Sequence, residues 1–209
     1  MKLLYSTHSP FARKTLVAAH ELGLADHIDI IHHEVSPTNR NEAIYAVNPL
    51  GLVPVLVLEN ESVLFDSNVI CEYLQEVQGN TPSIFPTDKE KRYVALRNQA
   101  IASGLCEAGI ALRWETERRP EQYRYPALRD GQLGKLVSTF EYLENNINFC
   151  VDKHCIDIGQ IALAIALDWI EFRQLANFRG SCPTLSKWHD SFKLRPSMLK
   201  TTMEGETHD

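Results

Sequence analysis

The stretch Asn48-Pro49-Leu50-Gly51-Leu52-Val53-Pro54-Val55-Leu56 decides the fold of the first part of the chain. It is a turn that leads into an apolar run, and Pro54 stands where that run begins. Because proline has no amide hydrogen for a strand ladder, sheets tolerate it only at a first or edge position. A proline at such a turn is typical of a cis peptide, which turns the amide and carbonyl of the preceding residue outward. We therefore expect Val53 to present an unpaired peptide group.

Short strands and helices alternate on both sides of this turn. The pattern predicts strand, helix and strand up to residue 34, and then helix, strand, strand and helix as far as residue 78. This order is the thioredoxin arrangement. The predicted strands are Lys2–Tyr5, Ile28–Glu34, Val55–Leu58 and Val63–Phe65, and the predicted helices are Pro10–Leu22, Asn41–Val47 and Asn68–Gln78.

From residue 88 onward the strand signals disappear and the apolar residues recur at helical spacing. We expect capping boxes at Thr87–Glu90 and at Asp157–Gln160. The predicted helices lie near 88–117, 126–147, 158–176 and 184–194. The expected fold class is therefore α/β plus all-α, with an N-terminal thioredoxin-like domain over 1–79, a turn-rich linker over 80–87 and a C-terminal helical bundle domain over 88–209.

The composition argues against several classes of partner. The chain of 209 residues has a net charge of −6 and 44% hydrophobic residues. It lacks the clustered basic excess that nucleic-acid binding needs, and we interpret its arginines between 113 and 129 as a solvated helix face and loop. No apolar run reaches the roughly 20 residues of a membrane span, and the first residues turn polar too early for a signal peptide. We expect a cytoplasmic protein with no nucleic-acid or membrane partner.

The cysteines and histidines give no metal signature. The five cysteines form neither a CxxC pair nor an even framework, which favours buried thiols in a reducing compartment. His32 and His33 are adjacent in a predicted strand and point to opposite faces. Cys150, His154 and Cys155 lack a partner pair. We therefore expect no metal.

Two short polar motifs stand at predicted helix starts. Asp66-Ser67 offers a carboxylate, a hydroxyl and the free amides of a first helical turn, which suit the ammonium and carboxylate of an amino acid. Ser9-Pro10 would be an ordinary N-cap followed by proline at the first helical position. Each motif alone is explained as a helix cap. The Val53-Pro54 turn favours a ligand site, because in a thioredoxin-like fold the first helix start and this turn lie side by side.

These motifs together resemble those of a known family. Ser9-Pro10-Phe11-Ala12-Arg13 after the first strand, the Asn48–Pro54 turn, Asp66-Ser67 and the all-helical second half look like a cytosolic-type glutathione S-transferase. The resemblance covers essentially the whole chain. Ser-Pro-Phe is similar to the motif of serine-type tau enzymes and many bacterial members, and it differs from the Cys-Pro-Phe of the omega type.

The resemblance implies that Ser9 is the catalytic residue and that glutathione reacts as its thiolate. A serine hydroxyl is too weak a base to remove the thiol proton. Ser9 would instead donate a hydrogen bond to the sulfur anion, helped by the positive end of the helix that begins at Pro10.

The resemblance also assigns the other glutathione contacts. The Val53-Pro54 turn would bind the cysteinyl backbone, and Asp66-Ser67 would hold the γ-glutamyl ammonium and carboxylate. Related proteins often have lysine where Leu52 stands. Arg40 or a main-chain contact is therefore expected to hold the glycyl carboxylate.

The electrophile is expected between the two domains. Phe11 would line its pocket together with one face of the first long helix of the bundle, and that face mixes small residues with one large aromatic. Ordinary helix packing explains each of these residues equally well. The expected lining residues on this helix are Gly104, Glu107, Ala108, Ala111 and Trp114.

The resemblance implies attack of the glutathione thiolate on a small apolar electrophile by a homodimer, with glutathione as co-substrate. The same scaffold also serves peroxide reduction, isomerisation and dehalogenation. Thiol exchange of the glutaredoxin kind is disfavoured, because it needs a cysteine where Ser9 stands. A different class of function, a non-enzymatic protein that keeps the fold for partner recognition, stays an alternative because fold alone does not decide function.

Overall fold

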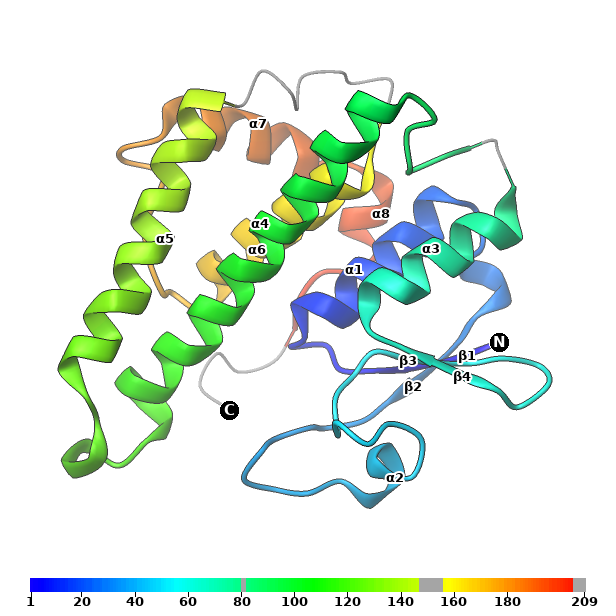
Figure 1. Cartoon of the computed structure of the whole chain (residues 1–209), viewed down its shortest axis with the longest axis horizontal. Coiled ribbons are helices and arrows are strands. Elements are labelled where there is room, and N and C mark those ends of the chain that lie inside the picture. The colour runs from blue at the N-terminus through cyan, green and yellow to red at the C-terminus, as the bar shows by residue number, and fades with distance from the viewer. Residues whose placement is uncertain (80–81, 147–155, 205–209) are drawn as a thin grey trace. The chain divides into compact units, whose positions relative to one another are not determined.

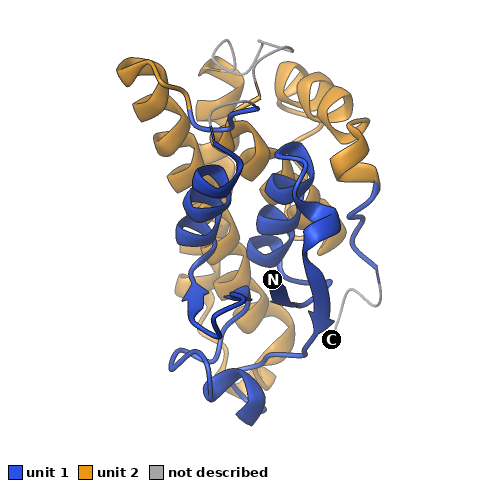
Figure 2. Ribbon diagram, turned by 90° about the vertical axis from the view of Figure 1, so that its right-hand side faces the viewer, with its two compact units in different colours: residues 1–85, 200–205 blue, residues 86–199, 206–209 orange. Residues whose placement is uncertain are grey.

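The computed structural model describes residues 1–79, 82–146 and 156–204. The chain divides into two compact units, which Figure 2 shows in different colours. Unit 1 comprises Met1–Phe85 together with the segment after Leu199, which is described as far as Glu204, and unit 2 comprises Pro86–Leu199. The expected second domain contained everything from 88 to 209, so the assignment of the segment after Leu199 to unit 1 differs from the sequence-based division.

Unit 1 contains a four-stranded sheet with the strand order β2-β1-β3-β4. The parallel pair β1 and β2 is joined through helix α1, as a parallel connection requires. Strand β3 runs antiparallel to both β1 and β4, and β3 and β4 form a hairpin. The strands are β1 (Lys2–Tyr5), β2 (Asp29–His32), β3 (Val55–Val57) and β4 (Val63–Phe65).

Helices α1 (Pro10–Glu21) and α3 (Ser67–Gln78) lie side by side and pack on the sheet (Figure 1). The short helix α2 (Glu42–Tyr45) is capped by Asn41, whose side-chain oxygen accepts from two of its first amides. A single 3-10 turn, η1 (Ala25–His27), precedes β2. The predicted order of strands and helices is confirmed, and so is the thioredoxin-like fold class, whereas the edge strand β2 is shorter than the predicted Ile28–Glu34.

Within its described residues, unit 2 contains helices joined by turns and loops, and no strand. Its helices are α4 (Lys89–Arg113), α5 (Pro126–Asn146), α6 (Ile158–Phe172), α7 (Pro183–Lys193) and α8 (Pro196–Leu199), with a π-helical turn η2 (Trp114–Arg118) after α4 and a 3-10 turn η3 (Glu121–Tyr123). Helix α6 is buried along most of its length, as its apolar sequence predicts. It packs closely on α4, because a Cβ atom at Gly159 would lie 2.5 Å from the carbonyl oxygen of Ala95.

The helix starts of unit 2 confirm one predicted capping box and correct the other. Asp157 accepts from the Gln160 amide at 2.9 Å, and the Gln160 side chain accepts from the Asp157 amide at 3.1 Å. The predicted box at Thr87–Glu90 is wrong. The N-cap of α4 is Asp88, whose carboxylate accepts from the Lys91 amide at 2.9 Å, and aspartate caps a helix better than threonine does.

Helix α6 also ends earlier than predicted. The expected helix continued to residue 176, but α6 ends at Phe172 and Gln174 adopts the left-handed conformation with a φ of 53°. The Leu175 amide then bonds back to the Ile170 carbonyl, which closes the helix end. Within the described parts of the chain, none of the helices combines the length and apolar character that crossing a membrane would require.

Candidate functional site

Ser9 is the N-cap of α1. Its Oγ accepts a hydrogen bond from the Ala12 amide at 3.2 Å, and its carbonyl accepts from the Arg13 amide at 3.0 Å. The side chain is half-buried. The cap bond uses a lone pair of the hydroxyl oxygen and leaves the O–H hydrogen to donate. The capping role and a donor role toward a ligand are therefore compatible.

The Val53–Pro54 peptide is cis, as expected. Within residues 1–79, 82–146 and 156–204, neither the amide nor the carbonyl of Val53 has a hydrogen-bond partner. Asn48 braces the turn that leads to it. Its side chain donates to the Leu52 carbonyl at 2.9 Å and accepts from the Leu50 amide at 3.0 Å.

Asp66 is the N-cap of α3, in an unusual backbone conformation with a φ of 68°. Its Oδ1 accepts from the Asn68 amide at 2.7 Å, and its side chain is exposed, so the second carboxylate oxygen faces solvent. Ser67 is only 3% exposed. The capping role is observed, and this cap leaves a carboxylate oxygen for an external donor.

The strand register brings these three segments to one edge of the sheet. Leu4 near the end of β1 pairs with Val55 at the start of β3, and Val55 pairs with Phe65 at the end of β4. The turn that carries Ser9 follows β1, Pro54 precedes Val55, and Asp66 follows Phe65. Residues far apart in the sequence are thus gathered where the three strands meet the loops.

The two candidates for the glycyl carboxylate differ in their surroundings. The Arg40 guanidinium bonds to Glu42 at 2.7 Å and lies 3.6 Å from the centre of the Tyr45 ring. Its Nη groups have room for a further acceptor because the side chain is more than half exposed. Leu52 is 56% exposed, while its carbonyl oxygen is held by Asn48.

The expected electrophile-lining residues of unit 2 show mixed exposure. Gly104 and Glu107 are exposed, Ala108 is buried and Ala111 is half-buried. Trp114 is not part of the regular helix, since α4 ends at Arg113 and Trp114 begins the π-helical turn. The arrangement of this helix face with Phe11 of unit 1 stays a prediction.

Sequence reasoning missed Lys14 and Asn68. Lys14 lies on α1 and is only 3% exposed, and its ammonium donates to the Asn68 side-chain oxygen on α3 at 2.7 Å. Burial raises the pKa of the nearby Cys71 thiol to about 11, against the opposing positive charge of Lys14. A lysine in a helix is ordinarily read as solvated, so the sequence held no signal for this contact.

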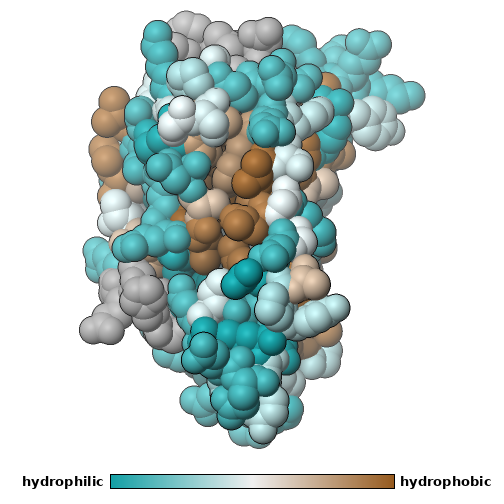
Figure 3. Space-filling model, turned by 90° about the vertical axis from the view of Figure 1, so that its left-hand side faces the viewer, coloured by the Kyte–Doolittle hydropathy of each residue, from teal (hydrophilic) through white to brown (hydrophobic). Residues whose placement is uncertain are grey.

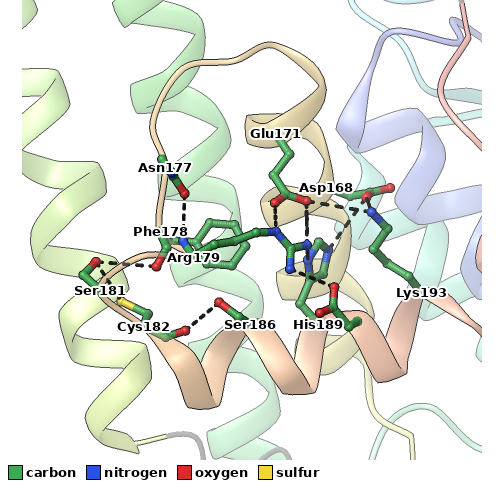
Figure 4. Close-up of polar contacts among 11 residues, drawn as sticks. Asp168, Glu171, Asn177, Phe178, Arg179, Ser181, Cys182, Ser186, His189 and Lys193 are labelled. Carbon is green, nitrogen blue, oxygen red and sulfur yellow. Dashed lines mark hydrogen bonds and ion pairs between the residues drawn. The ribbon is translucent and has the colours of Figure 1, made fainter.

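One group of residues has the composition of a metal site. Asp168 and Glu171 on α6 and His189 on α7 offer ligand atoms that lie within 4.8 Å of one another (Figure 4). Their charges are already balanced by the protein. The Lys193 ammonium lies 3.0 Å from Asp168, and the Arg179 guanidinium binds both oxygens of Glu171. We therefore assign no metal to this group.

Comparison with known proteins identifies the class. A model described as the glutathione S-transferase N-terminal domain matches residues 8–77. The GST-like protein YibF of Escherichia coli K12 is 30% identical over 96% of this chain and 98% of its own length, and mouse glutathione S-transferase omega-1 is 36% identical over 95% of this chain and 79% of its own.

Solved structures that resemble this chain belong to the same class of protein. A glutathione transferase family member from Pseudomonas fluorescens Pf-5, with bound glutathione, superposes with a TM-score of 0.92 at 32% identity and covers 98% of this chain and 99% of that one. A glutathione S-transferase from Methylobacillus flagellatus KT, also with bound glutathione, gives a TM-score of 0.83 at 31% identity over 97% and 99%. The fold and these relatives define a thioredoxin-like transferase with a helical C-terminal region. The chain belongs to the cytosolic-type glutathione S-transferase family.

Proposed function

We propose that this protein conjugates the glutathione thiolate to small apolar electrophiles, with Ser9 as the thiolate-stabilising residue. The observation that carries the proposal is the meeting of the Ser9 hydroxyl, the unpaired Val53 peptide and the Asp66 carboxylate at one sheet edge. Two of the solved structures that resemble this chain contain bound glutathione, and the groups at this sheet edge would suit the same ligand.

The chemical requirement is to ionise a thiol near neutral pH. Free thiols of this kind have a pKa of about 8.5, and lowering it by two units requires about 2.7 kcal/mol. A hydrogen bond to a charged acceptor supplies about 1.5–3 kcal/mol. The helix terminus adds about 0.3–1 kcal/mol. The Ser9 hydroxyl and the N-terminus of α1 are therefore sufficient for the task.

Glutathione would be held along the sheet edge. The Val53 amide and carbonyl would pair with the cysteinyl backbone beside the cis Pro54. Asp66 would receive the γ-glutamyl ammonium, and Ser67 with the first amides of α3 would receive its carboxylate. Arg40, or the main chain at Leu52, would hold the glycyl carboxylate.

The electrophile would bind beside the thiolate. We propose Phe11 of unit 1 and the face of α4 and its π-helical extension as its lining. Small side chains along that face would leave room for an apolar molecule, and Trp114 would supply a large aromatic surface. The proposed lining residues are Phe11, Gly104, Glu107, Ala108, Ala111 and Trp114.

A cytoplasmic homodimer is part of this proposal. Apolar residues are exposed in both units, among them Leu52 and Val69 in unit 1 and Leu133 and Val137 on α5. Figure 3 shows an apolar area framed by polar side chains on one face of the molecule, and such areas often mark protein contacts. Light scattering after gel filtration should give about twice the chain mass of 23.8 kDa. A single-chain mass would contradict the dimer.

The experiment for the proposed function is a calorimetric titration of the protein with glutathione, followed by a screen of apolar electrophiles for loss of free thiol. Saturable binding of one glutathione per chain, with thiol loss above the uncatalysed rate, is the expected result. Absence of binding, together with recovery of a large protein partner from an extract, would support the partner-recognition alternative instead.

A further inference from the structure

Lys14 is an ammonium group that the fold buries beside the proposed glutathione site. It lies five residues after Ser9 on α1 and is only 3% exposed. Moving an ammonium out of water is costly unless its charge is paired and hydrogen-bonded. Burying the Lys14 ammonium therefore costs free energy, and its hydrogen-bond partners indicate the role that it has.

Two hydrogen bonds through Asn68 connect Lys14 to Asp66. The ammonium donates to Asn68 Oδ1 at 2.7 Å, and the backbone amide of Asn68 donates to Asp66 Oδ1 at 2.7 Å. Asn68 therefore bridges the buried cation and the exposed carboxylate. Since α1 and α3 pack side by side, this bridge joins the helix that begins at Ser9 to the helix that begins at Asp66.

The charges of Lys14 and Asp66 both influence the thiol of Cys71 on α3. Burial is the main reason that the pKa of its thiol is raised, and the charges of Lys14 and Asp66 act on it in opposite directions. The ammonium of Lys14 and the carboxylate of Asp66 thus act on the same thiol, in keeping with the two hydrogen bonds through Asn68.

We propose that Lys14 is a positioning residue for the γ-glutamyl end of glutathione, acting through Asn68 on the Asp66 carboxylate. This inference rests on the proposed function. Lys14 does not touch the ligand in this account. It fixes the first turn of α3, so that the free oxygen of Asp66 meets the ligand ammonium without first losing rotamer freedom.

The test removes one group from the protein and one from the ligand. Asn68 is exposed, so Asn68→Ala breaks the bridge without opening the core. The two ligands are glutathione and its deaminated analogue, which lacks only the ammonium. In the wild type we expect the dissociation constant of the analogue to be about ten times that of glutathione. In Asn68→Ala we expect this ratio of dissociation constants to fall toward one, because the effects of removing two groups from one interaction network are not additive.

Three further variants complete the experiment. Asn68→Asp keeps an acceptor for Lys14 and should restore the ratio, and Val77→Ala, an exposed position at the other end of α3, should leave it unchanged. Lys14→Met should reproduce Asn68→Ala, and if it fails to fold, the Asn68 series decides alone. A ratio that is equally large in wild type and Asn68→Ala, or a ratio near one in the wild type, would overturn the inference. A wild type that binds no glutathione would instead refute the proposed function.

Discussion

At the scale of single residues, the sequence predicts helix caps, and the structure shows which polar atoms of the capping side chains stay available for a ligand. Helix capping explains both Ser9 and Asp66 in the sequence, and both make the expected cap bonds. Each retains one further group, a hydroxyl hydrogen or a carboxylate oxygen. Capping therefore positions these groups and does not compete with a ligand for them.

His189 gives a prediction at this scale. Its side chain is 0% exposed, and burial lowers its pKa to about 4, with Asp168 and Glu171 opposing the shift and Lys193 and Arg179 adding to it. Arg179 lies 3.3 Å from Nδ1, and because arginine only donates, this nitrogen is unprotonated.

The folded pKa of His189 lies below the unfolded value of about 6.5, so the unfolded chain binds its proton first. The stabilisation that comes from keeping His189 neutral is therefore fully present above about pH 6.5. As the pH drops toward 4, the free energy of unfolding falls by up to about 3 kcal/mol. Urea unfolding at pH 7, 5.5 and 4.5 should show a smaller decline in His189→Gln than in the wild type. Equal declines would contradict this account.

At the scale of elements, the caps of the helices of unit 2 can be tested. Asp157 caps the buried helix α6, and burial raises its pKa while the cap bonds to Gln160 and Gly159 oppose this. Asp157→Ala should lower the free energy of unfolding by about 0.5–2 kcal/mol, as measured in urea. Asp157→Asn keeps an acceptor and should retain most of the stability. If Ala and Asn behave alike, the cap is not the cause.

Helix α7 begins in a different way. Its N-cap, Cys182, makes no side-chain cap bond, and Glu144 of α5 accepts from the amides of Thr184 and Leu185 at 3.0 and 2.8 Å. Glu144→Ala should therefore destabilise the protein by about 1 kcal/mol in urea unfolding. Glu141→Ala, one turn earlier on α5, is the matched control. A loss no larger than that of the control would remove this cap from the account.

These elements also show how far the sequence could be interpreted. Local signals predicted the order of strands and helices and the Asp157 capping box, because each depends on neighbours in sequence. The Glu144 cap and the Lys14–Asn68 contact join residues 41 and 54 positions apart. No local pattern encodes such contacts. The misplaced cap at Thr87 reflects a competition between adjacent capping residues that spacing alone does not resolve.

At the scale of the whole molecule, the last described segment returns to unit 1. His8 Nε2 donates to the Glu204 carbonyl at 2.7 Å, and Thr201 is a buried partner of Arg13. Removing residues 201–209 should lower the melting temperature by several degrees, at about 2–4 °C for each kcal/mol lost. Removing 205–209 alone keeps both contacts and serves as control. An identical melting temperature for the two truncations would contradict this role.

The central claim is that Ser9 stabilises a bound thiolate, and the most direct measurement is the ultraviolet absorbance of bound glutathione thiolate against pH. In the wild type the thiol pKa should lie about two units below the free value of about 8.5. In Ser9→Ala, and in Ser9→Gly, which largely preserves the helix cap, it should return toward 8.5. A pKa that is equally depressed in the wild type and in both variants would contradict the claim.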